Sequence, residues 1–470
     1  MTSKISDALH QIETYFDQGR FQSELARLVS FQTESQTGEA MPAMVSYLND
    51  GIAPRLAAIG FDCTTCDNPR AHGGPIMVAV REERPDLPTV LIYGHGDVVH
   101  GQAGQWDNEM DPFVLRETDD RFYGRGVADN KGQHLINIAA LEAVLAVRGA
   151  MGFNVKILME MSEEIGSTGL AEFCAQNREM LAADVLIASD GPRVVADTPT
   201  LFLGSRGVVN FDLKVTLRDG ANHSGNWGGL LRDPAMVLAH ALASITDAHG
   251  QILIPEWRPD SLTDEVKADL ASIPVEGDGI DPSWNEAGLS AAEKVFGWNS
   301  FAVLALDHGE PEAPQNAIAG SARATCQLRF VVGTDEADIL PALRRHLDAG
   351  GFASVEIECV EGVAPATRSK ADNPWAQAVA ASLEDVMGKK PHILPNLAGW
   401  IPNHCFSEVL EMPTVWIPHS YKGCSQHAPN EHVLKDVCRD ALRGMVGVFW
   451  DIGGRSVLTR RDRRKSATEI

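Results

Sequence analysis

The stretch PTVLIYGHGD, residues 88–97, decides the fold. Its apolar run from Pro88 to Gly94 is short and continuous, which is typical of a strand buried on both faces of a sheet. The run stops at His95, and Asp97 follows two residues later. An imidazole that ends a buried strand, with a carboxylate just beyond it, suits a metal-bound histidine oriented by the acid. A capping aspartate beside a satisfied core histidine is the alternative interpretation.

Similar runs recur along the chain, and polar side chains follow each of them. The apolar spacing over 131–148 predicts a helix, and further strands are predicted where VKILMEM, DVLIASD and MPTVWIPHS occur. Buried strands that alternate with helices predict an α/β sheet, with its functional edge where strand C-termini meet loops. The side chains predicted at this edge are His95, Asp97, Asp129, Glu163, Glu164, Asp190 and His427.

The pattern changes after Arg206. GVVNFDLKVTLRDG and SARATCQLRFVV alternate as half-exposed strands, and helical stretches follow at 233–249 and 336–349. Two strands and two helices in this order predict a small α+β insertion, and the segment at about 255–315 reads as irregular.

Size and charge exclude several classes of protein. A chain of 470 residues suits two domains, and 64 acidic against 40 basic residues give a net charge of −24. This charge argues against a nucleic-acid partner, and no apolar run approaches the ~20 residues that span a bilayer. The N-terminus reads as an amphipathic helix rather than a secretory signal, so we expect a cytoplasmic protein. Its eight cysteines include one CxxC, Cys63 and Cys66, on a predicted exposed strand; reduced thiols are the expectation.

Acidic residues at the predicted edge offer several kinds of chemistry. Asp129 precedes the predicted helix, where it can cap that helix or bridge two cations with its two oxygens. Lys131 then packs near the site or lies on the surface. Glu163 and Glu164 are adjacent in a loop, so one can bind metal while the other holds an attacking water; surface charge is the alternative.

The remaining two candidates mean little alone. Asp190 in ASDGP could simply end a strand in a turn, and His427 could be an ordinary loop histidine. Together, carboxylates and imidazoles with no thiolate neighbour form a nitrogen and oxygen ligand set. That set suits zinc, with manganese or cobalt as substitutes.

At these residues the chain resembles the co-catalytic zinc peptidases, which include aminoacylase, acetylornithine deacetylase, succinyl-diaminopimelate desuccinylase, glutamate carboxypeptidase and carnosinase. The resemblance is carried by YGHGDVV, WDNEMDPF, YGRGVADNKG, MEMSEEIGSTG, ASDG, Arg206-Gly207, HSGNWGG and the His427 loop, in the family's order over nearly the entire chain. It implies a mixed-sheet catalytic domain with helices on both faces, residues 1–205 and 366–470. It also implies an inserted α+β lid and dimerisation domain, residues 206–365.

The resemblance further implies two divalent metal ions and a homodimer paired through the lid. The implied ligands are His95, Asp129, Glu164, Asp190 and His427, with Asp129 bridging the ions, Asp97 orienting a ligand and Glu163 acting as general base. His223 would reach the partner's active site and stabilise the oxyanion, unless it is a surface loop residue. Arg329 would bind a substrate carboxylate, with Asn316 near the same pocket.

One departure from the family concerns the loop that grips a substrate's terminal carboxylate. Relatives often carry a Gly-Gly-Ser type of loop, whereas this chain has Ala398-Gly399-Trp400-Ile401-Pro402. The Trp400 indole either points into the core, leaving the backbone to bind carboxylate, or forms an aromatic wall for a flat substrate.

The expected activity is two-metal hydrolysis of an amide bond in a peptide or N-acyl amino acid, most simply by a dipeptidase or carboxypeptidase-type enzyme. The enzymatic alternative is a deacylase of N-acyl amino acids, or a hydrolase of aryl amides or amines, on the same metal site. A catalytically silent binding protein would have lost the base or several ligands, and this sequence retains them all.

Overall fold

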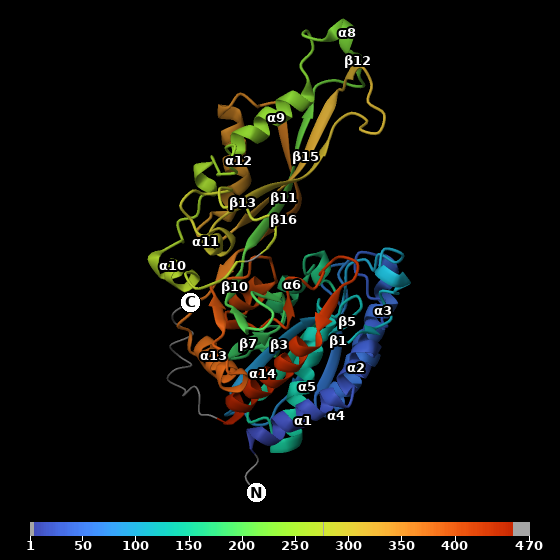
Figure 1. Ribbon diagram of the computed structural model, residues 1–470, viewed down its shortest axis with the longest axis vertical. Helices are drawn as coiled ribbons and strands as arrows, with labels where there is room; N and C mark the ends of the chain where they lie inside the picture. The colour runs from blue at the N-terminus through green and yellow to red at the C-terminus, as the bar shows by residue number, and fades with distance from the viewer. Residues whose placement is uncertain (1–3, 276, 455–470) are drawn as a thin grey trace. The chain divides into compact units, whose positions relative to one another are not determined.

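The computed structural model describes residues 4–275 and 277–454. By its internal contacts the chain divides into two compact units (Figure 1). Unit 1 comprises Met1–Gly204, Ser369–Leu397 and Ile401–Ile470, and unit 2 comprises Ser205–Arg368 and Ala398–Trp400. Within the described ranges, no helix combines the length and the apolar character that a bilayer crossing requires.

Unit 1 is built on an eight-stranded mixed sheet, which confirms the predicted α/β sheet and the mixed sheet that the family resemblance implies. The strand order is β1-β2-β6-β3-β7-β19-β9-β18. β3 pairs in parallel with β6 and β7, and β19 pairs in parallel with β7, whereas β1 and β2 are antiparallel. The carboxyl ends of the parallel strands therefore meet at one edge. The bounds are β1 Asp62–Cys66, β2 Ile76–Arg81, β3 Thr89–His95, β6 Asn154–Glu160, β7 Val185–Ala188, β9 Thr200–Phe202, β18 His392–Leu394 and β19 Thr414–Trp416.

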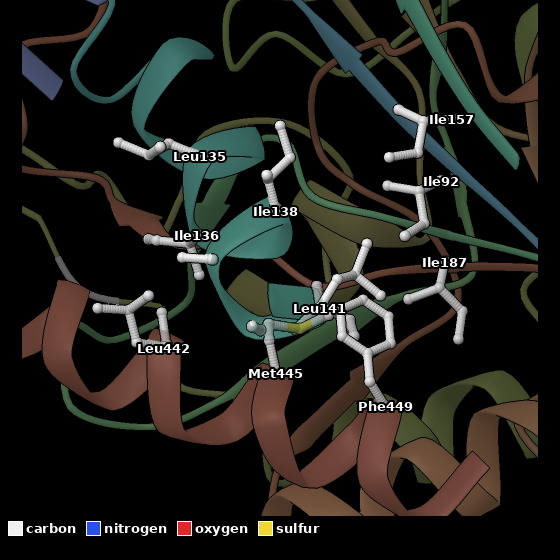
Figure 2. Close-up of a cluster of buried hydrophobic side chains, with 14 of the residues drawn as sticks. Ile92, Leu135, Ile136, Ile138, Leu141, Ile157, Ile187, Leu442, Met445 and Phe449 are labelled. Atoms are coloured by element: carbon white, nitrogen blue, oxygen red, sulfur yellow. The ribbon is translucent and has the colours of Figure 1, made fainter. Parts of the chain in front are cut away.

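Helices cover both faces of this sheet because successive strand residues point to opposite sides. On one face α5 (Lys131–Arg148) lies between the sheet and α14 (Lys435–Gly454). Figure 2 shows Ile92, Ile157 and Ile187 of three neighbouring strands on the sheet side of α5, and Leu442, Met445 and Phe449 of α14 on its other side. α5 has the bounds that the sequence predicts.

The opposite face is packed with aromatic side chains. Tyr93, the neighbour of Ile92 on β3, places its ring 5.4 Å from those of Phe406 and Trp416. Phe406 belongs to the short helical segment η7 (Cys405–Val409), which packs beside α6 (Leu170–Gln176). Each central strand is thus buried on both faces, which explains the continuous apolar runs in the sequence.

Smaller elements complete unit 1. The bounds are α1 Ile5–Asp17, α2 Arg20–Val29, α3 Met41–Ser46, α4 Ala53–Ala58, α7 Arg178–Leu181 and α13 Pro374–Met387, with strands β4 Arg116–Glu117, β5 Arg121–Tyr123, β8 Pro192–Arg193, β20 Ser420–Tyr421 and β21 His432–Leu434. Cys63 and Cys66 both lie on β1, and their odd spacing directs them to opposite faces of the strand. All eight cysteines are free thiols, so the CxxC does not form an internal disulfide.

Unit 2 contains a four-stranded antiparallel sheet in the order β13-β15-β11-β16. β11 (Gly207–Thr216) and β15 (Ser321–Phe330) correspond to the two predicted strands. The sheet has four strands where the sequence predicted two. The two strands that were not predicted, β13 (Ser300–Asp307) and β16 (Val355–Ala364), flank β15 and β11. β13 falls inside the segment interpreted as irregular. It is an edge strand with an exposed apolar run, which lacks the alternation that identifies a half-buried strand.

Two helices cover one face of this sheet and bury its core. The bounds are α9 Pro234–Ile245 and α12 Ile339–Ala349, with α8 Ser224–Trp227, α10 Asp264–Leu270, α11 Ala291–Phe296, β12 Asn222–His223 and β14 Ala317–Ile318 elsewhere in unit 2. The core combines apolar residues of alternate strand positions, such as Phe211 and Leu328, with the buried ring of Trp257. Two further short strands are β10 Gly204–Ser205 and β17 Thr367–Arg368.

Candidate metal centre

His95 and Asp97 lie at the end of β3, and both side chains are buried. The Asp97 carboxylate lies 3.3 Å from Nδ1 of His95, an arrangement that leaves Nε2 of the imidazole facing the other acids. Asp97 also accepts hydrogen bonds from the backbone N–H groups of Glu163 (3.2 Å) and Glu164 (3.0 Å). One carboxylate thus holds both a histidine and the turn that carries the acid pair.

Asp129 lies between two imidazoles. Its Oδ1 is 3.0 Å from Nε2 of His95, and its Oδ2 is 3.0 Å from Nε2 of His427. Gln426 also donates a hydrogen bond to Oδ2. The helix-cap interpretation of Asp129 is wrong, because the N-cap position of α5 is occupied by Asn130. The Asn130 side chain makes no hydrogen bond to the backbone of the first turn.

The acids and imidazoles form two groups that share Asp129. In each group the candidate ligand atoms all lie within 4.8 Å of one another. Nε2 of His95 is 3.6 Å from Oδ2 of Asp190, and Nε2 of His427 is 3.0 Å from Oε2 of Glu164. The first group is His95, Asp129 and Asp190; the second is Asp129, Glu164 and His427.

Glu163 lies beside the first group, with Oε2 4.0 Å from Nε2 of His95. It begins the short 3₁₀ turn Glu163–Ile165 that follows β6, so its side chain and that of Glu164 point in different directions. Asp190 lies two residues after the end of β7 at Ala188, and His427 lies in an irregular loop after β20 with a φ of 61°. A non-glycine residue with positive φ is held there by its surroundings.

The pKa values of three acids and both imidazoles in the cluster are shifted upwards, as expected where several buried carboxylates lie close together. Burial, followed by the charge of neighbouring carboxylates, raises the pKa of Asp190 to about 6 and that of Glu164 to about 7. Burial raises the pKa of Glu163 well above its usual range. Hydrogen bonds to Asp129 and Glu164 raise the pKa of His427 to about 11. For His95, burial favours the neutral ring, but hydrogen bonds to the two aspartates outweigh it and raise the pKa.

This donor set fits divalent cations. Buried carboxylates normally require compensating positive charge, and here protons on imidazoles and acids are the available counterions. Oxygen and imidazole nitrogen donors from five side chains, with Asp129 shared between the two groups, are ligands that zinc and manganese accept.

Polar side chains of α5 support the loops around the cluster. Gln133 donates a hydrogen bond to the carbonyl of Ala128 (2.8 Å) and accepts one from the backbone N–H of His419 (2.7 Å). Asn137 contacts the hydroxyl of Ser189 at 2.9 Å, next to Asp190. The first turns of α5 therefore join the segments that precede both aspartates.

Three further residues at the centre have different sequence signals. Lys131 is buried, and its Nζ donates to the carbonyl of Phe31 at 2.7 Å, so it is not a solvated surface lysine. Glu160 was not among the predicted site residues; it is buried at the end of β6 and accepts the hydroxyl of Tyr93 at 2.7 Å. Its signal in the sequence is an acid at the end of an apolar run. Gln426 carries no comparable signal.

The remaining candidates lie in unit 2 and separate into distinct places. His223 is exposed on β12, paired with Ala317 of β14, so Asn316 lies close by. Arg329 lies near the end of β15, opposite Val208 at the start of β11. β15 spans about 30 Å, so within one chain Arg329 and His223 lie at opposite ends of this strand pair.

The loop at Gly399 and Trp400 is only partly buried. The carbonyl of Gly399 accepts a hydrogen bond from the backbone N–H of Arg206 at 3.1 Å. Trp400 is of intermediate exposure, so its indole is neither a fully buried core side chain nor a fully exposed one.

Known proteins resemble this chain in sequence and in fold. The model of peptidase family M20/M25/M40 matches residues 91–450. The cysteinylglycine-S-conjugate dipeptidase of Corynebacterium striatum is 29% identical over 360 residues, which cover 75% of this chain and 77% of the relative. The β-Ala-His dipeptidase of Mus musculus is 26% identical over 382 residues, which cover 76% of each protein.

The solved structures agree in fold. Human carnosine dipeptidase 1 superposes with a TM-score of 0.79 at 23% sequence identity, and the match covers 96% of this chain and 99% of that one. The family match extends over more than half of the chain and includes both groups of candidate ligands. The chain therefore belongs to peptidase family M20/M25/M40 and is a metal-dependent hydrolase that acts on peptide bonds.

Proposed function

We propose that the protein is a dipeptidase that works with two divalent metal ions, most simply zinc. The observation that carries the proposal is the sharing of Asp129 between two groups of candidate ligands. In this assignment His95, Asp129 and Asp190 hold one ion, and Asp129, Glu164 and His427 hold the other. Bound ions at these positions would supply Lewis acidity to the peptide carbonyl and to the attacking water.

Glu163 is the proposed general base. Its side chain is only 13% exposed, lies beside His95 and is not needed for either group of ligands. It is placed to take a proton from the attacking water and to deliver it to the leaving amine nitrogen, so water and a peptide yield a carboxylic acid and an amine. Asp97 is the proposed orienting acid, because it contacts His95 and fixes the Glu163-Glu164 turn.

Dipeptides are the proposed substrates because the relatives named above are dipeptidases. The test is a panel of dipeptides, N-acetyl amino acids and N-succinyl amino acids, assayed on protein loaded with zinc, manganese or cobalt, with metal analysis of the same samples. We expect two ions per chain and hydrolysis of dipeptides. Activity confined to N-acyl substrates would overturn the dipeptidase assignment while keeping the metal site.

We also propose a homodimer formed through unit 2. Within the part of the chain that the structure describes, β13 is an edge strand of its sheet, and Val303, Leu304 and Leu306 on it are exposed. In the dimer His223 would stabilise the oxyanion at the partner's site. The separation of His223 from Arg329 within one chain favours this assignment, because the two residues would then act at different sites. Arg329 and Asn316 would bind the substrate, together with the loop at Gly399 and Trp400.

The dimer is tested by light scattering coupled to gel filtration on wild-type protein and on a Leu304→Lys variant. We expect a dimer for the wild type and a shift towards monomer for the variant, because a charge on the edge strand opposes pairing. A monomeric wild type would overturn this part of the proposal. A cytoplasmic location is proposed as well, since eight free thiols suit a reducing compartment.

A further inference from the structure

Glu431 is a buried carboxylate outside both groups of candidate ligands. It lies four residues after His427, directly before β21, and only 1% of it is exposed. A buried carboxylate needs compensating hydrogen bonds or positive charge. The contacts that provide them identify what Glu431 does.

One oxygen of Glu431 organises the backbone that leads into Asp129. Oε1 accepts hydrogen bonds from the backbone N–H groups of Gly126 (3.0 Å), Ala128 (2.9 Å) and Asp129 (3.2 Å). These N–H groups precede α5, so no helical carbonyl satisfies them. Three N–H donors converging on one oxygen fix the path of this loop, and with it the direction of the Asp129 side chain.

The other oxygen binds a buried cation. Oε2 of Glu431 accepts a hydrogen bond of 2.7 Å from Nη1 of Arg125, and the side chains of both residues are 1% exposed. The guanidinium also lies over the ring of Trp106, 5.7 Å from its centroid. Separating a buried ion pair leaves each charge uncompensated, which is strongly unfavourable. The Glu431 carboxylate is therefore held in place by Arg125.

Backbone contacts connect the same two segments. The carbonyl of Glu431 accepts the N–H of Gly124 at 3.0 Å, and β21 pairs with β5 through His432 and Tyr123. The side chain of Asn430 also accepts the backbone N–H of Asp107, which belongs to a third segment, at 2.9 Å. The loop that carries His427 and the loop that carries Asp129 are therefore held in one register, and the Glu431 side chain spans them through backbone N–H groups, whereas Gln426 contacts the Asp129 carboxylate itself.

We propose that Glu431 is a positioning residue that sets Asp129 and His427 at the spacing which the second metal ion requires. The inference rests on the proposed two-metal function. It predicts a graded effect: loss of Glu431 disturbs two of the three ligands of the group Asp129, Glu164 and His427, but one ligand of the group His95, Asp129 and Asp190.

The test is to titrate the metal-free full chain with Co²⁺. Binding is monitored both by calorimetry and by the visible absorption of the bound ion. For Glu431→Gln we expect one of the two dissociation constants to rise by about 10–100-fold, and the other to rise less. Excess Co²⁺ should restore dipeptide hydrolysis in Glu431→Gln, whereas it should not restore Glu163→Gln, which lacks the base.

Glu83 provides a matched control. It is a carboxylate of unit 1 that accepts the backbone N–H groups of Met151 and Gly152 and pairs with Arg81, and it lies near the start of β6 rather than its end. Glu83→Gln should lower the melting temperature of the metal-free protein while changing each dissociation constant by less than about twofold. A merely structural role for Glu431 would give the two variants the same profile.

Each outcome decides a separate question. Unchanged dissociation constants in Glu431→Gln, or an equal weakening in Glu83→Gln, would overturn the positioning role even if the wild type binds two ions and cleaves dipeptides. A wild type that binds no Co²⁺ would instead overturn the proposed function. Glu431→Ala is the stronger perturbation; if it does not fold, Glu431→Gln decides, because it keeps the side-chain volume and one oxygen acceptor.

Discussion

The two groups of candidate ligands differ in how they are built. His95 and Asp190 follow β3 and β7, which are neighbours in the sheet, and with Asp129 they are buried. Glu164 and His427 come from a turn and an irregular loop, and 52% of the His427 side chain is exposed. The first group is therefore fixed by the sheet, whereas the second depends on contacts between loops.

This contrast separates two requirements of a metal centre. Strand ends supply ligands whose positions follow from sheet packing, and burial makes their negative charge unfavourable without a cation. Loops supply ligands that remain open to solvent, where a substrate can approach. Asp129 belongs to both groups, so its removal tests whether they are one centre.

The largest effect is expected for Asp129→Ala. Because both groups lose a ligand, we expect the protein to lose both ions and hydrolysis to fall to the uncatalysed level, at least about 10⁶-fold. Metal analysis after dialysis and a dipeptide assay measure this, with Glu83→Gln as the control. One ion retained at wild-type affinity would show that the groups are independent.

Glu163→Gln is expected to have the next largest effect. The substitution removes the proton acceptor but no proposed ligand, so kcat should fall by about 10²–10⁴-fold while two ions stay bound. The metal content and kcat of the same preparation are the measurements. A variant that retains full turnover would remove Glu163 from the mechanism.

Asp190→Asn tests the electrostatics of the buried group, His95, Asp129 and Asp190, through its effect on the stability of the protein. Burial and the nearby Asp129 raise the pKa of Asp190 to about 6, above its ordinary value of 3.8. The native state therefore binds its proton more tightly than the unfolded state, and stability falls as pH rises from about 4 to 6 and stays lower above it. At pH 8 the metal-free variant should be more stable than wild type by about 3 kcal/mol, and at pH 3.5 the gain should vanish.

Urea unfolding of metal-free protein at the two pH values measures this difference. A gain of equal size at both would mean that packing, rather than charge, is responsible.

The smallest effect on stability is expected for His427→Ala. This substitution should destabilise the metal-free protein, whereas Asp190→Asn should stabilise it. Hydrogen bonds to Asp129 and Glu164 raise the pKa of His427 to about 11, so its charge stabilises the metal-free protein fully below pH 6.5, and this contribution declines as pH rises towards 11. Because half the side chain is exposed, the loss at pH 6 should stay below about 1 kcal/mol. The same urea titration measures it, and a gain in stability would contradict the contrast between the groups.

The sequence predicts the parts of this molecule that depend on periodic burial. The apolar runs that end at His95 and before Asp190, and the helical spacing over 131–148, correspond to β3, β7 and α5 because each is buried on more than one side. The convergence of these ends follows from parallel pairing. Fold class and the cluster of acids were therefore accessible from residues alone.

Other parts depend on contacts that no local pattern encodes. The edge strand β13 is exposed and so lacks alternation. Glu160, Gln426 and Glu431 act through partners that are distant in sequence, such as Tyr93 for Glu160 and Asp129 for Gln426. The separation of Arg329 from His223 follows from the pairing of β11 with β15, which the sequence does not reveal.

The placement of α5 between the sheet and α14 has a consequence for how the protein loses activity. Its first turns bind the loops next to Asp129 and Asp190, and its later turns belong to the largest apolar core. Local opening of the segments next to Asp129 and Asp190 would therefore require the first turns of α5 to separate from them. Amide hydrogens around these two aspartates should exchange only through global unfolding, and heat inactivation should coincide with melting of the whole of unit 1.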